Sequence, residues 1–104
     1  MKKTVISIVI ALAVTTSVIA KDIVVDQKDK TFIPTKVEAN VGDKIVFKNS
    51  DGFAHNAFTD NEENEFDIGM QKPGEDVSVE MKAPGVVEVE CAIHPNMHLE
   101  ILVK

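Results

Sequence analysis

The chain has 104 residues, with 11 basic and 17 acidic side chains and a formal net charge of −6. This length accommodates one domain. The acidic balance argues against nucleic acid and anionic membranes as partners.

The start of the chain has the pattern of a secretory signal. Two lysines follow the initial methionine, residues 5–19 are mostly apolar, and Ala20 supplies a small residue before a cleavage point. The apolar stretch is shorter than the ~20 residues that a spanning helix prefers, so cleavage is favoured over an uncleaved membrane anchor. We therefore expect a signal peptide over residues 1–20 and a periplasmic or otherwise secreted domain over residues 21–104, without membrane insertion after cleavage.

The single cysteine, Cys91, is informative for an exported chain. Secretion implies an oxidising compartment, where a lone thiol cannot form an internal disulfide. A domain of this size has a modest core, to which a bound metal adds useful stability. The cysteine count therefore weakens a disulfide scaffold and favours a metal-bound thiolate.

Beyond residue 20 the chain is predicted to be built of short strands and turns. Residues 77–81 and 86–91 alternate between apolar and polar side chains, as half-buried strands do. Further strands are expected at residues 23–25, around Val37, at 44–49 and at 99–103. Turns or polar connections are expected at residues 26–30, 32–34, 40–43, 50–52, 59–65, 72–75 and 83–85. Without a helical period of ten or more residues, this spacing favours an all-β sandwich or Greek-key barrel.

Four metal donors stand out in this β-rich chain. Cys91, His94 and Met97 follow one another at three-residue intervals, and His55 lies upstream at a predicted junction of loop and strand. Taken singly, each has an ordinary structural explanation, as core filler or as a hydrogen-bonded histidine. Together, two imidazoles, a thiolate and a weak thioether are the donor set of a blue-copper site, acceptable to both Cu(I) and Cu(II).

Two segments resemble a known family. Residues 91–97 are similar to the copper loop of the cupredoxins, with the short spacing of amicyanin, and residues 49–56 resemble the segment that carries the first histidine ligand in plastocyanin-like proteins. The resemblance covers most of residues 21–104. It implies a cupredoxin-like Greek-key β-sandwich or barrel that binds one copper ion per chain, as Cu+ or Cu2+.

The resemblance also implies roles for individual residues. His55, Cys91 and His94 would be the equatorial ligands and Met97 the axial one, while Asn56 would help to hold the ligand loops together. The ring edge of His94 would lie near the surface within an apolar patch. The candidates for that patch are Phe53, Ala54, Ile68, Met70 and Pro95. His98 is expected to be a surface imidazole, because the alternation of side chains along the last strand turns it away from Met97.

The function implied is the transfer of single electrons between redox proteins, such as a c-type cytochrome or a dehydrogenase, without enzymatic turnover. A copper carrier or chaperone with the same ligands is the alternative. An interaction module in which Cys91 is buried or bridges a dimer is a third possibility. The acidic run at residues 60–65 is either a solvated loop or a surface that steers a basic partner.

Overall fold

The computed structural model describes residues 19–104, so the predicted signal peptide lies almost wholly outside the described residues. In that part of the chain nine β-strands occur and no helix. No helix long and apolar enough to cross a membrane is therefore found there. The strands are β1 (Asp22–Lys28), β2 (Thr31–Ile33), β3 (Lys36–Ala39), β4 (Lys44–Asn49), β5 (Phe58–Thr59), β6 (Phe66–Asp67), β7 (Asp76–Glu80), β8 (Gly85–Glu90) and β9 (His98–Val103).

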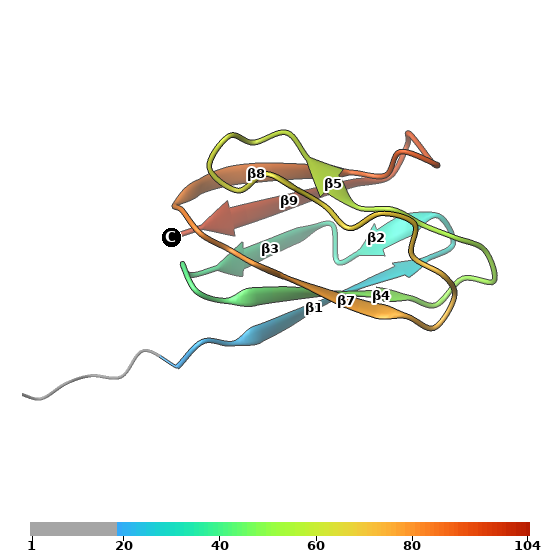
Figure 1. Ribbon diagram of the computed structural model, residues 1–104, viewed down its shortest axis with the longest axis horizontal. Helices are drawn as coiled ribbons and strands as arrows, with labels where there is room; N and C mark the ends of the chain where they lie inside the picture. The colour runs from blue at the N-terminus through green and yellow to red at the C-terminus, as the bar shows by residue number, and fades with distance from the viewer. Residues whose placement is uncertain (1–18) are drawn as a thin grey trace, which may run out of the picture.

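The strands form two sheets that face each other (Figure 1). One sheet has the order β2-β1-β4-β7, and the other has the order β3-β9-β8-β5-β6. β1 pairs with β4 in parallel and β3 pairs with β9 in parallel, while the remaining pairs are antiparallel. The predicted all-β sandwich is confirmed.

The core lies between the two sheets and follows the alternation of the strands. In β4 the side chains of Ile45 and Phe47 are fully buried, whereas their lysine neighbours are exposed. The Phe47 ring lies 6.2 Å from the Phe32 ring and 5.9 Å from the Phe66 ring, measured between centroids. Aromatic contacts at these separations join strands of both sheets, which stabilises the sandwich beyond area burial alone.

Two expectations near the start of the described chain are wrong in part. Residues 26–28 belong to β1 and not to a connection, and of residues 32–34 only Pro34 lies in a bend, because Phe32 and Ile33 belong to β2. β1 continues through the polar segment to Lys28, and β2 pairs back onto it, with Lys28 opposite Thr31. The turn is made by Asp29 and Lys30, whose φ angles are 54° and 55°. Two successive positive φ angles are typical of the tight turns that match the twist of a hairpin. Polar side chains hid this hairpin from the sequence pattern.

The polar segment at residues 59–65 is also more ordered than its composition suggested. Asn64 is 3% exposed, and its side-chain oxygen accepts hydrogen bonds from the amides of Lys82 (2.7 Å) and Ala83 (3.1 Å). Its amide nitrogen donates to the carbonyl of Ala83 at 2.8 Å. These bonds fasten the segment beside the beginning of β8.

Candidate metal centre

Cys91 comes directly after β8 and continues the inward alternation of that strand. Val87, Val89 and Cys91 are all buried, with Cys91 only 2% exposed. The connection to β9 then turns sharply, because the amide of Met97 donates to the carbonyl of His94 at 3.0 Å. The Cys91 thiol at the end of β8 and the His94 imidazole in the following turn therefore lie at the same end of the molecule.

His55 reaches this place from the connection between β4 and β5. Its backbone is held by two hydrogen bonds to Gln71, one in each direction, at 3.0 and 2.8 Å. The His55 side chain is fully buried. A histidine from an upstream loop is thus fixed beside the Cys91 loop, as the sequence pattern predicted.

Three donor atoms converge at this end of the sandwich. One ligand atom each from His55, Cys91 and His94 lies within 4.8 Å of the other two. The Cys91 sulfur is 3.9 Å from Nδ1 of His94, and the centroids of the two imidazole rings are 4.9 Å apart. Metal–ligand bonds of about 2.0 to 2.3 Å would place two ligands of one ion about 4 Å apart. The spacing of the donors therefore suits a single metal ion.

The hydrogen bonding of His55 supports the same interpretation. Its Nε2 lies 2.6 Å from Oδ2 of Asp51, whereas its Nδ1 is buried and has no hydrogen-bond partner among residues 19–104. A buried polar atom without a partner is costly. A metal ion bound by Nδ1 would satisfy it. Together with a thiolate and a second imidazole, this donor set fits copper.

Met97 lies on the same loop and is 1% exposed, within the hydrophobic core. Its side chain is therefore on the inner side of the loop and not on the molecular surface. Its role as the axial ligand stays a prediction from the spacing of the sequence.

Asn56 connects the two loops that carry the donors. Its backbone amide donates to the sulfur of Cys91 at 3.4 Å, and its side-chain oxygen accepts a hydrogen bond from the amide of Ala92 at 3.2 Å. Its side-chain nitrogen donates to Asp67 Oδ1 (2.8 Å) and to the carbonyl of Gly69 (2.9 Å). The structure thus shows the loop-holding contacts expected of this residue.

His94 is half-buried and lies between aromatic neighbours. The Phe53 ring is 5.4 Å from the His94 ring, and Phe53 itself is 41% exposed. Loss of hydration lowers the pKa of His94, and electrostatic interactions with the neighbouring His55 ring and with Lys30 lower it further. A lowered pKa favours the neutral imidazole, whose unprotonated nitrogen can act as a metal donor.

The predicted apolar patch is only partly present. Phe53, Met70 and Pro95 are exposed and Ala54 is half-buried, whereas Ile68 packs against the core. Ile93, which was not among the expected members, is also exposed (43%) and adjoins His94 in the chain.

Two further surface predictions concern His98 and the acidic run. His98 is exposed at the start of β9, as expected. The acidic run at residues 60–65 is fastened beside the beginning of β8, whereas Cys91 follows the end of that strand. Six residues of strand span about 20 Å, so Asn64 in this run lies well away from the donor cluster. Asp60, by contrast, follows β5, whose Phe58 pairs with Glu90 next to Cys91.

Comparison with known proteins places this geometry in a family context. The model of a family described as copper binding proteins, plastocyanin/azurin family, matches residues 19–104. A plastocyanin from Vicia faba is 35% identical over 74 residues, which cover 61% of this chain and 75% of that protein.

Solved structures agree in fold. A Cu-containing nitrite reductase from Thermus scotoductus superimposes with a TM-score of 0.74 and 26% identity, over 80% of this chain but only 22% of the reductase chain. A reduced amicyanin variant superimposes with a TM-score of 0.73 and 23% identity, over 85% of this chain and 87% of the amicyanin. The amicyanin likeness concerns the fold alone, and it matches this chain along nearly the whole length of both proteins.

Proposed function

The chain belongs to the plastocyanin/azurin family of copper-binding proteins, and we propose that it carries single electrons between redox proteins in the periplasm or another secreted compartment. The observation that carries this proposal is the cluster of His55, Cys91 and His94, whose donor atoms lie within 4.8 Å of one another. The prediction that the chain is not an enzyme is confirmed by its family, since plastocyanins are electron carriers.

The proposed ligand set is His55, Cys91, His94 and Met97, holding one copper ion. The ion would supply the redox chemistry by alternating between Cu(I) and Cu(II). The chain's own contribution is to keep the donors in place in both states. Hydrogen bonds from Gln71 to the His55 backbone and from Asn56 to the Cys91 sulfur hold the two loops without the ion.

His94 is the proposed contact point for the partners. Its ring is half-buried, and the exposed side chains of Phe53, Ile93 and Pro95 lie close to it in space or in the chain. Apolar side chains around an imidazole allow another protein to approach closely, because little hydration has to be removed. A c-type cytochrome or a dehydrogenase with an apolar rim around its own cofactor is the kind of partner that we propose.

The experiment that tests this function is an optical titration of the protein with Cu(II). An intense visible thiolate-to-copper band should saturate at one equivalent, vanish on reduction and return on oxidation. A colourless protein would contradict the blue-copper assignment. A coloured protein that released its copper rapidly on reduction would instead support a copper carrier.

Replacing Met97 with glutamine tests the axial position. An amide oxygen is a harder ligand than a thioether and stabilises Cu(II) relative to Cu(I). Copper should therefore remain bound while the reduction potential falls. Each tenfold gain in preference for Cu(II) lowers the potential by about 59 mV. Met70→Gln is a matched control, because Met70 is 72% exposed. Equal potentials for the two variants in voltammetry would remove Met97 from the ligand set.

A further inference from the structure

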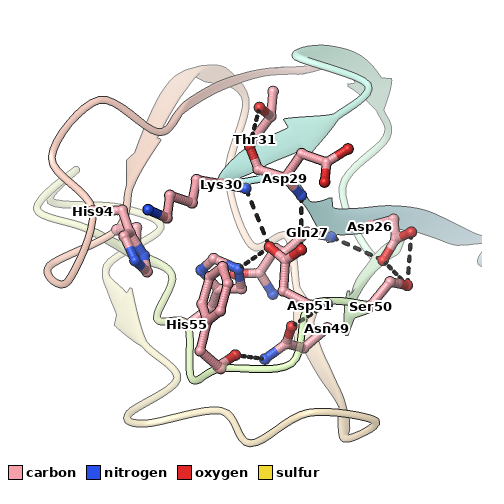
Figure 2. Close-up of polar contacts among 12 residues, drawn as sticks. Asp26, Gln27, Asp29, Lys30, Thr31, Asn49, Ser50, Asp51, His55 and His94 are labelled. Atoms are coloured by element: carbon pink, nitrogen blue, oxygen red, sulfur yellow. Dashed lines mark hydrogen bonds and ion pairs between the residues drawn. The ribbon is translucent and has the colours of Figure 1, made fainter.

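The carboxylate of Asp51 occupies an unusual position beside the donor cluster. Its Oδ2 lies 2.6 Å from Nε2 of His55, four residues along the chain, and its side chain is only 9% exposed. The same carboxylate accepts hydrogen bonds from the amides of Asp29 (2.8 Å) and Lys30 (3.1 Å). Figure 2 shows Asp51 between the β1–β2 turn and the His55 ring.

These contacts identify Asp51 as a hydrogen-bond acceptor. The backbone amides of Asp29 and Lys30 can only donate, so each carboxylate oxygen already accepts a hydrogen bond. A carboxylate only accepts hydrogen bonds, so the proton in the short contact with Oδ2 resides on Nε2 of His55. The other ring nitrogen, Nδ1, then carries a lone pair.

The environment of Nδ1 leaves its lone pair available for a metal ion. Nδ1 of His55 is buried and has no hydrogen-bond partner in the described part of the chain. His55 contributes one ring nitrogen to the cluster with Cys91 and His94, and since Nε2 is hydrogen-bonded to Asp51, Nδ1 is the nitrogen left for a metal ion. Because Gln71 fixes the His55 backbone by two hydrogen bonds, the contact with Asp51 determines the remaining freedom of the ring.

The turn that supports Asp51 is itself strained. Asp29 and Lys30 both have positive φ angles, near 54° and 55°, which is uncommon for residues other than glycine. Such strain persists only where the surroundings compensate for it. Here the two amides of the turn both donate to Asp51, so the hairpin and the histidine share one acceptor.

We propose that Asp51 is a positioning residue of the metal centre: its carboxylate holds the His55 imidazole as the Nε2-protonated tautomer, directs Nδ1 toward Cys91 and His94, and strengthens this nitrogen as a donor to Cu(II). The effect of Asp51 on copper binding rests on the proposed function, whereas its effect on the His55 tautomer does not. A carboxylate hydrogen-bonded to a ligand histidine raises its basicity, and the loss of such a partner typically costs about 10- to 100-fold in metal affinity.

The test compares Asp51→Asn with Asp26→Asn. Asp26 is a matched control, because its carboxylate accepts from Ser50 Oγ (2.7 Å) and from the Gln27 amide in the neighbouring part of β1 without touching His55. Both substitutions remove one negative charge and disturb hydrogen bonds of the same region. Only the first removes the charged acceptor from the histidine.

The first readout needs no metal. In imidazole ¹H–¹⁵N spectra of the metal-free protein, wild type and Asp26→Asn should show His55 protonated at Nε2, and Asp51→Asn should lose this single tautomer. The second readout is affinity. Asp51→Asn should bind Cu(II) about 10- to 100-fold more weakly, bind Cu(I) with a smaller change, and therefore have a raised reduction potential.

Asp51→Glu keeps the charge and should bind Cu(II) more tightly than Asp51→Asn, which guards against a variant that merely folds poorly. If Asp51→Asn kept the tautomer, the affinity and the potential of the control and lost only thermal stability, the positioning role would be wrong. If the wild type bound no copper, the proposed function would fall, while the tautomer spectrum would still decide the role of Asp51.

Discussion

Replacing Cys91 with serine is expected to abolish the visible charge-transfer band of the copper-loaded protein. The band requires a thiolate, and Cys91 is the only cysteine in the chain. The loss of an outer partner of a ligand already costs about 10- to 100-fold in affinity, so the loss of the thiolate itself should weaken Cu(II) binding by more than about 100-fold. Absorption spectroscopy and a competition titration measure the two effects.

The fold should tolerate this substitution. Cys91 is 2% exposed beside core strand β8, and a serine oxygen can still accept the hydrogen bond that Asn56 now donates to sulfur. Ala92→Ser is the control, because it adds the same hydroxyl one residue further along at an exposed position. A Cys91→Ser protein that stayed as blue as this control would exclude Cys91 from the ligand set.

The buried thiol also weighs against the form of the interaction-module alternative in which Cys91 bridges a dimer. A disulfide between two chains requires both sulfurs to be accessible, and Cys91 has almost no exposed surface. Oxidation to a dimer would therefore require the loop after β8 to open. A metal-bound or inert thiol is the better interpretation of a cysteine held in this way.

Much of the fold could be predicted because the strands of the core alternate clearly. β4, β8 and β9 bury every second side chain, so the apolar periodicity identified them and their approximate limits. The hairpin of β1 and β2 escaped because its buried face includes a polar residue, Gln27, whose amide donates to Gln71 at 2.6 Å. A glutamine whose partner lies 44 residues away leaves no local signal.

The donor cluster was predictable for a different reason. Cys91, His94 and Met97 occupy one short loop, so their spacing predicts that they lie near one another, and the structure brings the predicted His55 together with Cys91 and His94. The residues that support the donors are harder to identify from the sequence. Asp51 was interpreted only as part of a turn, because its role depends on a hairpin turn 21 and 22 residues upstream.

Replacing Asn56 with alanine is expected to damage both stability and the metal centre. The side chain is 6% exposed and makes three hydrogen bonds, to Asp67, to the Gly69 carbonyl and from the Ala92 amide. Leaving buried partners unsatisfied costs about 1 to 3 kcal/mol for each group, less where water can enter. We expect the free energy of unfolding of the metal-free protein to fall by about 2 to 4 kcal/mol.

The loss should reach copper binding because Asn56 is the bridge between the two donor loops. Without its bond to the Ala92 amide, the loop carrying Cys91 is free to move away from His55, and ordering it again would consume binding energy. Asn40→Ala is the control, since Asn40 is exposed and its side chain makes no hydrogen bond within residues 19–104. Urea unfolding of both variants measures the effect on stability, and Cu(II) titration measures the effect on copper binding. If the two variants were equally stable, the donor loops would be held by their backbones alone. If Asn56→Ala were less stable but bound copper with unchanged affinity, Asn56 would support the sandwich without aligning the site.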